Sequence, residues 1–422
     1  MYYGYGFSDE VVRLAEQAER DCAARFAETD EICLRRSADI LRAFQENRVS
    51  TADFLEVTGY GYTDPGREKL ERIYAQIFGA EDALVRVQIM SGTHALTLAL
   101  GGILKYGDTL LAVSGDPYDT LQGVIGITGG SRNSLIANGI RYEKIDLVGD
   151  DFDHEAIRRR LTEGKKVRCV HIQRSRGYAR RKSLTLGKIG RVIRTVREAD
   201  PEAIVFVDNC YGEFVENAEP THLGADLIVG SMMKNPGGGI AVTGGYCAGR
   251  RDLIGDVAER LTCPCVGRDL GANLNQLTSL YKGLFLAPSV TRSAVRSMIF
   301  ASRLLELAGF TGLSPRYDEE RTDIVQTVDL LTAENLVAFC RGLQRGSPIE
   351  AYAVPEPCEM PGYEDKEVMA GGSFTSGSTI ELSCDGPVKP PYTAFMQGGL
   401  SYEYGKLGVM NAVDFMLRQK KA

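Results

Sequence analysis

The feature that most constrains this chain is a regular alternation of short apolar runs with longer amphipathic segments. The apolar runs lie at residues 83–89, 109–113, 141–147, 167–173, 203–207 and 226–230. Helices are predicted between several of them, at 94–105, 153–162 and 186–199. Strands that alternate with helices in this way are joined by crossover connections, so the pattern predicts an α/β domain with a largely parallel sheet.

The segments on either side of this region have a different pattern. Residues 8 to about 48 carry apolar side chains at helical spacing. The last part of the chain mixes helix candidates with strand-like runs, at 293–308, 332–344, 350–354, 379–383 and from about 403. With 422 residues, more than one domain is expected. We predict an N-terminal helical segment (1–50), a large domain (51–290) and a smaller α+β domain (291–422).

Composition argues against several classes of partner. The net charge is −7, so nothing indicates a nucleic-acid partner. No apolar run reaches the ~18 residues that cross a membrane, and the first residues do not resemble a secretory signal. Ten cysteines are scattered without zinc-like spacing, although Cys263 and Cys265 lie close together. We therefore expect a cytoplasmic protein with reduced thiols and no nucleic-acid, membrane or metal partner.

Two strand ends carry the side chains that most define the chemistry. Asp208 closes the run at 203–207, and Lys234 follows the run at 225–229. Because ligands of open α/β sheets bind beyond the carboxyl ends of strands, both groups are expected at one site. Pyridoxal phosphate (PLP) needs this pair, since an acid keeps its ring nitrogen protonated and an amine forms the Schiff base. Taken alone, each also fits a simpler interpretation, as a capping aspartate and a surface lysine.

A phosphate site is predicted at the start of the helix that begins near residue 94. Ser91, Gly92 and Thr93 lie at this junction, where unpaired N–H groups and the positive helix end attract anions. Ser231 offers a further hydroxyl. Ordinary helix capping explains the same three residues equally well.

Tyr118 follows the run at 109–113, and its ring is expected either to lie on the cofactor or to pack the turn. A glycine cluster at 126–130 is a rival binding loop, but it lacks the surroundings of a dinucleotide fingerprint. His94 and His171 are expected to be structural.

These motifs, in this order, resemble those of the fold-type I PLP enzymes, specifically the methionine gamma-lyase and cystathionine lyase relatives. The resemblance is carried by Val-Asp-Asn-Cys-Tyr at 207–211, Ser-Met-Met-Lys at 231–234, Ser-Gly-Thr at 91–93 and the turn at Tyr118. One branch of these enzymes, the aluminium resistance protein family, is similar to this chain in its local sequences, at 58–62, 78–81, 91–95 and 172–178.

The resemblance implies a fold-type I PLP-dependent transferase fold and a role for each matching residue. Lys234 would hold PLP and shuttle protons, Asp208 would pair with the ring nitrogen, and Tyr118 would stack on the ring. Ser91, Gly92, Thr93 and Ser231 would bind the phosphate.

The resemblance also implies a homo-oligomer. In the relatives, a Tyr and an Arg from a neighbouring subunit complete the phosphate site, and Tyr62 and Arg67 are the similar positions here. The active unit would be at least a dimer, and a homotetramer built as a dimer of dimers is expected.

Two positions depart from the relatives. In the relatives, an asparagine-containing turn stands where this chain has Gln-Arg-Ser-Arg at 173–176. They also hold the substrate carboxylate with an arginine of the C-terminal domain, whereas this chain offers Lys389, which binds as a point charge without a bidentate fork.

The function expected from these residues is that of a PLP-dependent carbon–sulfur lyase. It would eliminate a thiol from the β or γ carbon of methionine, cystathionine or cysteine, with Lys234 taking the α-proton. Tyr62 and Tyr118 are candidates to protonate the leaving group. The alternatives are another PLP-dependent enzyme (a transferase, aminotransferase or decarboxylase), a catalytically silent PLP-fold protein with a stress-related role, and a nucleotide-binding protein that uses the glycine clusters.

Overall fold

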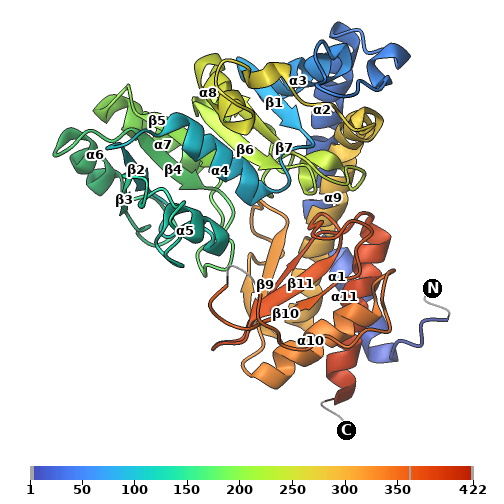
Figure 1. Cartoon of the computed structure of the whole chain (residues 1–422). Helices are drawn as coiled ribbons and strands as arrows, with labels where there is room; N and C mark the ends of the chain where they lie inside the picture. Colours follow the sequence, from blue (N-terminus) through green and yellow to red (C-terminus); the bar gives the residue numbers. More distant parts are fainter. Residues whose placement is uncertain (1–3, 361–362, 420–422) are drawn as a thin grey trace. The chain divides into compact units, whose positions relative to one another are not determined.

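A computed structural model describes residues 4–360 and 363–419 (Figure 1). The chain forms two compact units. One comprises Arg35–Leu286, and the other combines the residues up to Leu34 with those from Ala287 onward. The division falls within two long helices, α2 (Ala23–Glu46) and α9 (Leu277–Leu307).

The larger unit is built on one sheet. Its strands are β1 (Asp82–Arg86), β2 (Thr109–Ala112), β3 (Arg141–Lys144), β4 (Cys169–Gln173), β5 (Ile204–Asp208), β6 (Leu227–Ser231) and β7 (Gly245–Gly249). Their order across the sheet is β1-β7-β6-β5-β4-β2-β3. The pairs from β3 to β6 are parallel, whereas β7 runs antiparallel to both of its neighbours. The predicted, mostly parallel sheet is confirmed.

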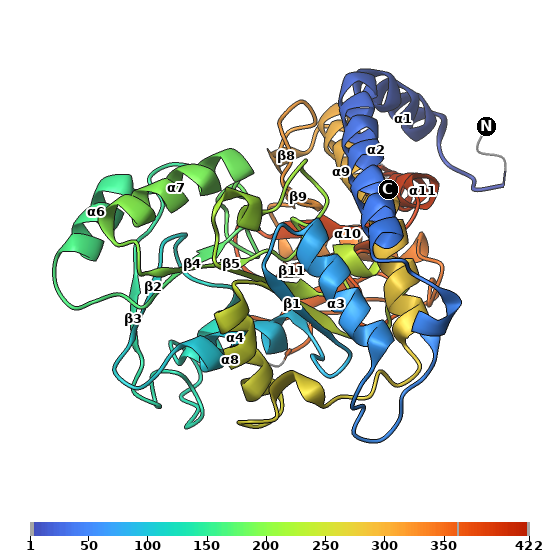
Figure 2. The ribbon, with the colours of Figure 1, turned by 90° about the horizontal axis from the view of Figure 1, so that it is seen from above.

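Helices cover both faces of this sheet (Figure 2). They are α3 (Pro65–Ile77), α4 (Gly92–Ile103), α5 (Asp119–Ile125), α6 (His154–Thr162), α7 (Leu186–Ala199) and α8 (Arg251–Leu261), with short 3₁₀ turns at Thr51–Phe54, Pro220–Leu223, Asn235–Gly237 and Gly267–Asp269. Figure 2 shows α6 and α7 on one side and α4 and α8 on the other. Every residue of β4, β5 and β6 is buried, which explains why these strands read as continuous apolar runs.

The parallel central strands bring three residues to one edge of the sheet. Gln173 ends β4, Asp208 ends β5 and Ser231 ends β6. Gln173 pairs with Asp208, and Asp208 pairs with Val229, so the three ends lie in successive positions along this edge. The loops that leave these strands therefore carry the expected site.

The smaller unit combines helices with a second sheet. Its helices are α1 (Asp9–Asp21), α10 (Ala333–Arg345), α11 (Tyr402–Gln419), the start of α2 and most of α9. Its strands are β8 (Thr311–Ser314), β9 (Val325–Asp329), β10 (Glu367–Ala370), β11 (Ser383–Pro387) and β12 (Thr393–Gln397). All printed pairings are antiparallel, in the order β10-β11-β12-β9-β8. This is the expected α+β architecture.

Some local predictions for this part of the chain are wrong. Residues 350–354 form no strand, because Tyr352 and Val354 are 87% and 62% exposed and pack against no sheet. The strand expected at 379–383 instead begins at Ser383. The helix expected at 293–308 starts at Leu277 and continues through Pro288. The N-terminal helical region is two helices with a break at Cys22.

Candidate active site

Lys234 lies directly after β6, at the start of the 3₁₀ turn Asn235–Gly237. Its Nζ lies 4.0 Å from the centre of the Tyr211 ring. The turn is held by Asn235, whose Nδ2 donates to the carbonyls of Tyr211 (3.0 Å) and Glu213 (2.9 Å). A Cβ at Gly237 would lie 1.6 Å from the Met232 oxygen, so glycine is needed there for close packing. The lysine is thus half-buried on a fixed turn.

Gly92 brings the separate loops of the site together. A Cβ at this position would lie 3.1 Å from Cys210 Sγ, 3.7 Å from Ser231 Cβ and 3.8 Å from Lys234 Nζ. The N-terminus of α4, the turn after β5 and the turn after β6 therefore converge on one point. The missing side chain leaves a cradle beside the lysine amine, and the structure brings Gly92, Ser231 and Lys234 together.

Asp208 is buried at the end of β5, with 6% of its surface exposed. Its Oδ1 accepts a hydrogen bond from the backbone nitrogen of Cys210 (3.1 Å). Burial, followed by the charge of Asp208, raises the pKa of the Cys210 thiol well above its ordinary value. Cys210 is therefore a neutral thiol between the carboxylate and Gly92, and it is no nucleophile at neutral pH.

Several charges act on Lys234. Burial disfavours its ammonium, but neighbouring acidic groups, among them Asp208 and Glu213, act more strongly and raise the pKa of Lys234. The contact with the Tyr211 ring favours the cation as well. Asp208 and Lys234 are thus electrostatically coupled across the strand ends, as expected for two groups of one site.

The first turn of α4 is capped as the sequence predicts. Ser91 Oγ accepts from the backbone nitrogen of His94 (3.1 Å). The hydroxyl of Thr93 forms a 2.7 Å hydrogen bond with that of Thr120 on α5. The first N–H groups of a helix have no helical acceptor, so this end of α4 attracts an anion beside Gly92.

Tyr118 caps α5 and is fixed by Gln173. Gln173 Oε1 accepts from the Tyr118 nitrogen (2.6 Å), and Gln173 Nε2 donates to the Ser175 oxygen (2.9 Å). A Cβ at Gly177 would lie 2.8 Å from Tyr118 Cδ2, and the Tyr178 ring centre is 6.0 Å from that of Tyr118. The tyrosine is therefore held by the loop that follows β4.

Tyr62 and Arg67 have different environments. Tyr62 is 55% exposed, and its ring centre lies 5.6 Å from that of Tyr60, which is also exposed. Arg67 is 3% exposed, and its Nη1 donates to the carbonyls of Gly61 (2.9 Å) and Gly271 (2.7 Å). Arg67 thus ties the loop of Tyr62 to the larger unit.

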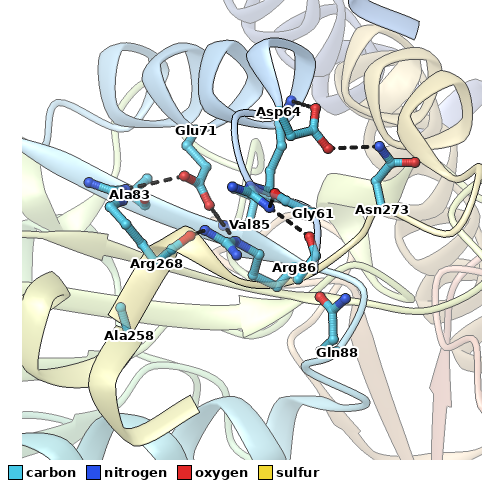
Figure 3. Close-up of polar contacts among 12 residues, drawn as sticks. Gly61, Asp64, Glu71, Ala83, Val85, Arg86, Gln88, Ala258, Arg268 and Asn273 are labelled. Carbon is cyan, nitrogen blue, oxygen red and sulfur yellow. Dashed lines mark hydrogen bonds and ion pairs between the residues drawn. The ribbon is translucent and has the colours of Figure 1, made fainter. Parts of the chain in front are cut away.

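Further polar contacts hold together the segments next to this loop (Figure 3). Asp64 caps α3 and accepts from Asn273 Nδ2 (2.8 Å), and Glu71 Oε1 accepts from Arg86 Nε (2.7 Å). Figure 3 shows these groups directed toward one another between α3 and β1. The loop therefore has a rigid base and an exposed aromatic tip.

Lys389 belongs to the smaller unit, and its side chain is 58% exposed. Its Nζ forms a 2.6 Å ion pair with Asp365. To bind a substrate carboxylate, Lys389 would have to exchange this partner.

Sequence reasoning missed three groups near Lys234. Tyr211 contacts the amine, Cys210 lines the cradle, and Glu213 raises the pKa of the lysine. Tyr211 adopts φ +71°, a conformation that side-chain-bearing residues seldom adopt outside constrained sites. In the sequence, these residues could have been found from their position shortly after Asp208, in the loop predicted to leave that strand.

In residues 4–360 and 363–419, no three His, Cys, Asp or Glu side chains gather as a metal site. Among the helices of the same residues, none is both long and apolar enough to cross a membrane.

The sequence pattern of the methionine gamma-lyase family matches residues 11–417. The chain belongs to this family. The predicted membership in a family of lyases is thereby confirmed.

Several known proteins are similar to this member of the methionine gamma-lyase family along almost its whole length. The uncharacterized protein YnbB of Bacillus subtilis is 45% identical over 410 residues, which cover 97% of each chain. A carbon–sulfur lyase involved in aluminium resistance from Clostridium novyi NT has a TM-score of 0.93 and 44% identity, covering 97% of this chain and 96% of its own. A candidate cystathionine beta-lyase involved in aluminium resistance from Clostridium acetobutylicum has a TM-score of 0.95 and 42% identity, covering 97% and 96%.

A solved structure of much lower sequence identity has a fold similar to that of this methionine gamma-lyase family member. CalE6, a methionine gamma lyase from Micromonospora echinospora, has a TM-score of 0.54 at 18% identity, with 82% of this chain and 85% of CalE6 covered. The fold-type I architecture expected from the sequence is confirmed, and the resemblance to the aluminium resistance branch is confirmed as well.

Proposed function

We propose that this chain is a PLP-dependent carbon–sulfur lyase that acts on a sulfur-containing amino acid. Methionine, cystathionine and cysteine are the candidate substrates, with elimination at the β or γ carbon. One observation carries the proposal: the Lys234 amine lies beside the cradle at Gly92, next to the turn that leaves Asp208. The carbon–sulfur lyase from Clostridium novyi NT, 44% identical over 97% of this chain, supports the reaction class.

The residues present fit PLP. The cradle at Gly92 adjoins the end of α4, where Ser91, Gly92 and Thr93, with Ser231 opposite, would bind the phosphate. Asp208 would hold the ring nitrogen protonated. Lys234 would bind the aldehyde carbon. When bound, PLP supplies a ring that accepts the electrons of the broken bond.

Each protein group has a defined task in this proposal. Nζ of Lys234, once the substrate amine replaces it, takes the proton from the substrate α-carbon. The Tyr118 ring, held by Gln173, would lie on the cofactor face. The hydroxyl of Tyr118 or Tyr62 would protonate the leaving sulfur.

We further propose that the active form is a homo-oligomer, a dimer of dimers. An exposed aromatic tip on a rigid base, as formed by Tyr60 and Tyr62, is suited to enter a neighbouring copy. Tyr62 and Arg67 would then serve the partner's phosphate site. Light scattering of the purified protein gives the number of copies directly. A cytoplasmic location is proposed because no disulfide joins the cysteines that the structure describes.

Lys389 is the proposed anchor for the substrate carboxylate. Because Asp365 is an ion-pair partner of Lys389, the Asp365→Asn variant would remove this competing carboxylate, whereas Lys389→Ala would remove the ammonium. An anchor role predicts a higher KM for Lys389→Ala and little change in kcat.

The test of the proposed reaction is incubation of the holoprotein with each of the three amino acids. At least one of these amino acids should yield a keto acid, ammonia and a free thiol such as homocysteine. Lys234→Ala should abolish both the visible cofactor absorbance and turnover, while Lys166→Ala, which removes an exposed lysine, should keep both.

A second function keeps the cofactor but changes the reaction. Gln173 engages the protein with both ends of its amide, and it lies in the stretch 173–176, where the resemblance to the lyase relatives implies an asparagine-containing turn. This difference favours a transferase, aminotransferase or decarboxylase if no keto acid forms. Bound PLP without any spectral response to amino acids would indicate a catalytically silent protein.

A further inference from the structure

Glu213 is a fully buried carboxyl group in the turn between Asp208 and the lysine loop. Its Oε1 accepts a hydrogen bond from the Tyr246 hydroxyl (2.8 Å) on β7. Its Oε2 is buried and has no hydrogen-bond partner within the part of the chain that the structure describes. A charged carboxylate with an unsatisfied buried oxygen is costly, whereas a protonated one is much less so.

The surrounding atoms hold this carboxyl group in place. A Cβ at Gly230 of β6 would lie 2.3 Å from Glu213 Oε1 and 2.5 Å from the Tyr246 ring, so no side chain fits between strand and acid. Asn209 Nδ2 donates to the Tyr246 hydroxyl (3.3 Å), which orients that hydroxyl toward Glu213. The arrangement is built around Oε1 and leaves Oε2 as the atom that can carry a proton.

Glu213 is linked to Lys234 through Asn235. Asn235 Nδ2 donates to the Glu213 carbonyl (2.9 Å) and to that of Tyr211 (3.0 Å), whose ring lies under the lysine amine. The backbone of the acid and that of the lysine turn are therefore fixed to each other. Their side-chain charges act on each other through a buried region, where screening by water is weak.

The charged and titratable groups that face Glu213 come from several elements. Burial is the main cause that raises the pKa of Glu213 to about 8, and Glu219 raises it too, whereas Tyr246 and Lys234 lower it. The field of Glu213 is felt in turn by Tyr74, Arg174, Cys210, Lys234 and Tyr246. These opposing effects together place the pKa of Glu213 at about 8, slightly above neutral pH.

We propose that Glu213 is a positioning residue whose buried carboxyl is coupled to the Lys234 nitrogen, so that the ionised carboxylate favours the positively charged nitrogen and the protonated acid favours the neutral one. This rests on the proposed function only in taking Lys234 as the cofactor lysine. By linkage, each group changes the proton affinity of the other by the same factor. At a fixed pH, a proton gained by the lysine nitrogen then favours loss of the proton from Glu213, which limits the change of charge near that nitrogen.

The first test is infrared spectroscopy of the purified holoprotein as a function of pH. A carbonyl band of a protonated, buried carboxylic acid should be present at pH 6.5 and should fade with a midpoint near 8. The band should be missing in Glu213→Gln and unchanged in Glu202→Gln, which removes an exposed carboxylate. A spectrum of Glu213→Gln identical to that of the natural protein would overturn the proposal.

The second test follows the visible absorbance of bound PLP with pH. Glu213→Gln keeps the shape of the side chain but cannot ionise, so it should lower the midpoint of this titration by about half a pH unit or more, roughly threefold in proton affinity. Glu202→Gln should leave the midpoint unchanged. Equal midpoints for the natural protein and Glu213→Gln would also overturn the proposal.

A further variant covers the case in which Glu213→Gln does not fold. Tyr246→Phe removes the hydrogen bond to Oε1 but keeps the acid, so the carbonyl band should persist to higher pH. A band with an unshifted midpoint would contradict the assignment to Glu213. If PLP does not bind at Lys234 at all, the proposed function fails, whereas bound PLP with an insensitive titration defeats the role of Glu213 alone.

Discussion

Gln173 accepts a hydrogen bond from the backbone nitrogen of Tyr118 over 2.6 Å, which joins the end of β4 to the start of α5. The other end of the same amide donates to the Ser175 carbonyl. One side chain thus fixes the turn that presents the tyrosine ring. This gives Gln173 a positioning role, distinct from direct contact with the cofactor.

Replacing Gln173 by Ala is therefore expected to weaken cofactor binding. Loss of both hydrogen bonds should release the Tyr118 turn at a cost of about 1–2 kcal/mol, which corresponds to roughly 5- to 30-fold in Kd. Titration of the apoprotein with PLP, followed by absorbance, measures this. Gln173→Glu keeps the acceptor for Tyr118 and should lose less; equal losses in both variants would argue against the positioning role.

Gly92→Ala should block the cradle. Its Cβ would press on Cys210 Sγ at 3.1 Å and lie next to Lys234 Nζ, where the cofactor is expected. Overpacking of this size costs about 1–3 kcal/mol, so PLP affinity should fall roughly 5- to 150-fold. Gly123→Ala in α5 is the matched control, because a Cβ there meets nothing within 4 Å. Normal PLP affinity in Gly92→Ala would place the cofactor elsewhere.

Glu219 is expected to be essential for stability. It is fully buried and accepts from Arg36 Nη2 (3.0 Å) and Asn209 Nδ2 (3.0 Å). Glu219→Ala would remove the nearer carboxylate of the buried Arg36 and leave Asp39, at 3.6 Å, as its ion-pair partner among the described residues, so the free energy of unfolding should drop by about 3 kcal/mol. Glu198→Ala, which breaks an exposed pair with Arg158, should cost less than about 1 kcal/mol. Denaturant unfolding compares the two, and similar small losses would contradict the prediction.

His171 should make the apoprotein sensitive to acid. Burial lowers its pKa to about 4, and neither ring nitrogen has a hydrogen-bond partner among the described residues. Because the unfolded histidine binds protons more readily, the stability from this group is present above pH 6.5 and is lost between 6.5 and 4. The loss is about 3 kcal/mol. His171→Leu should flatten this acid limb in denaturant unfolding; an unchanged slope would rule the histidine out.

Much of the fold could be predicted from the sequence because burial leaves a clear pattern. Strands such as β5 are buried on both faces and read as apolar runs. β7 was missed because glycine stands at both of its ends, and β10 because a four-residue strand with Glu367 gives little signal. Within residues 350–354 the apolar side chains of Tyr352 and Val354 are exposed, so hydrophobicity alone gave the wrong strand.

The candidate site, too, could be predicted only in part from the sequence. Lys234 and Asp208 could be found because strand ends of a parallel sheet share one edge. Tyr211 and Glu213 could not, because their roles depend on a left-handed backbone at Tyr211 and on contacts with β7. The position of Arg67, buried against the carbonyls of Gly61 and Gly271, likewise depends on long-range packing.

The central claim is that Lys234 is the residue that binds PLP. Borohydride reduction of the holoprotein, followed by proteolysis and mass spectrometry, locates the pyridoxyl group on one lysine. We predict that it is found on the peptide containing Lys234, with one group per chain. A pyridoxyl group on any other lysine, or none on a chain saturated with PLP, would contradict the account.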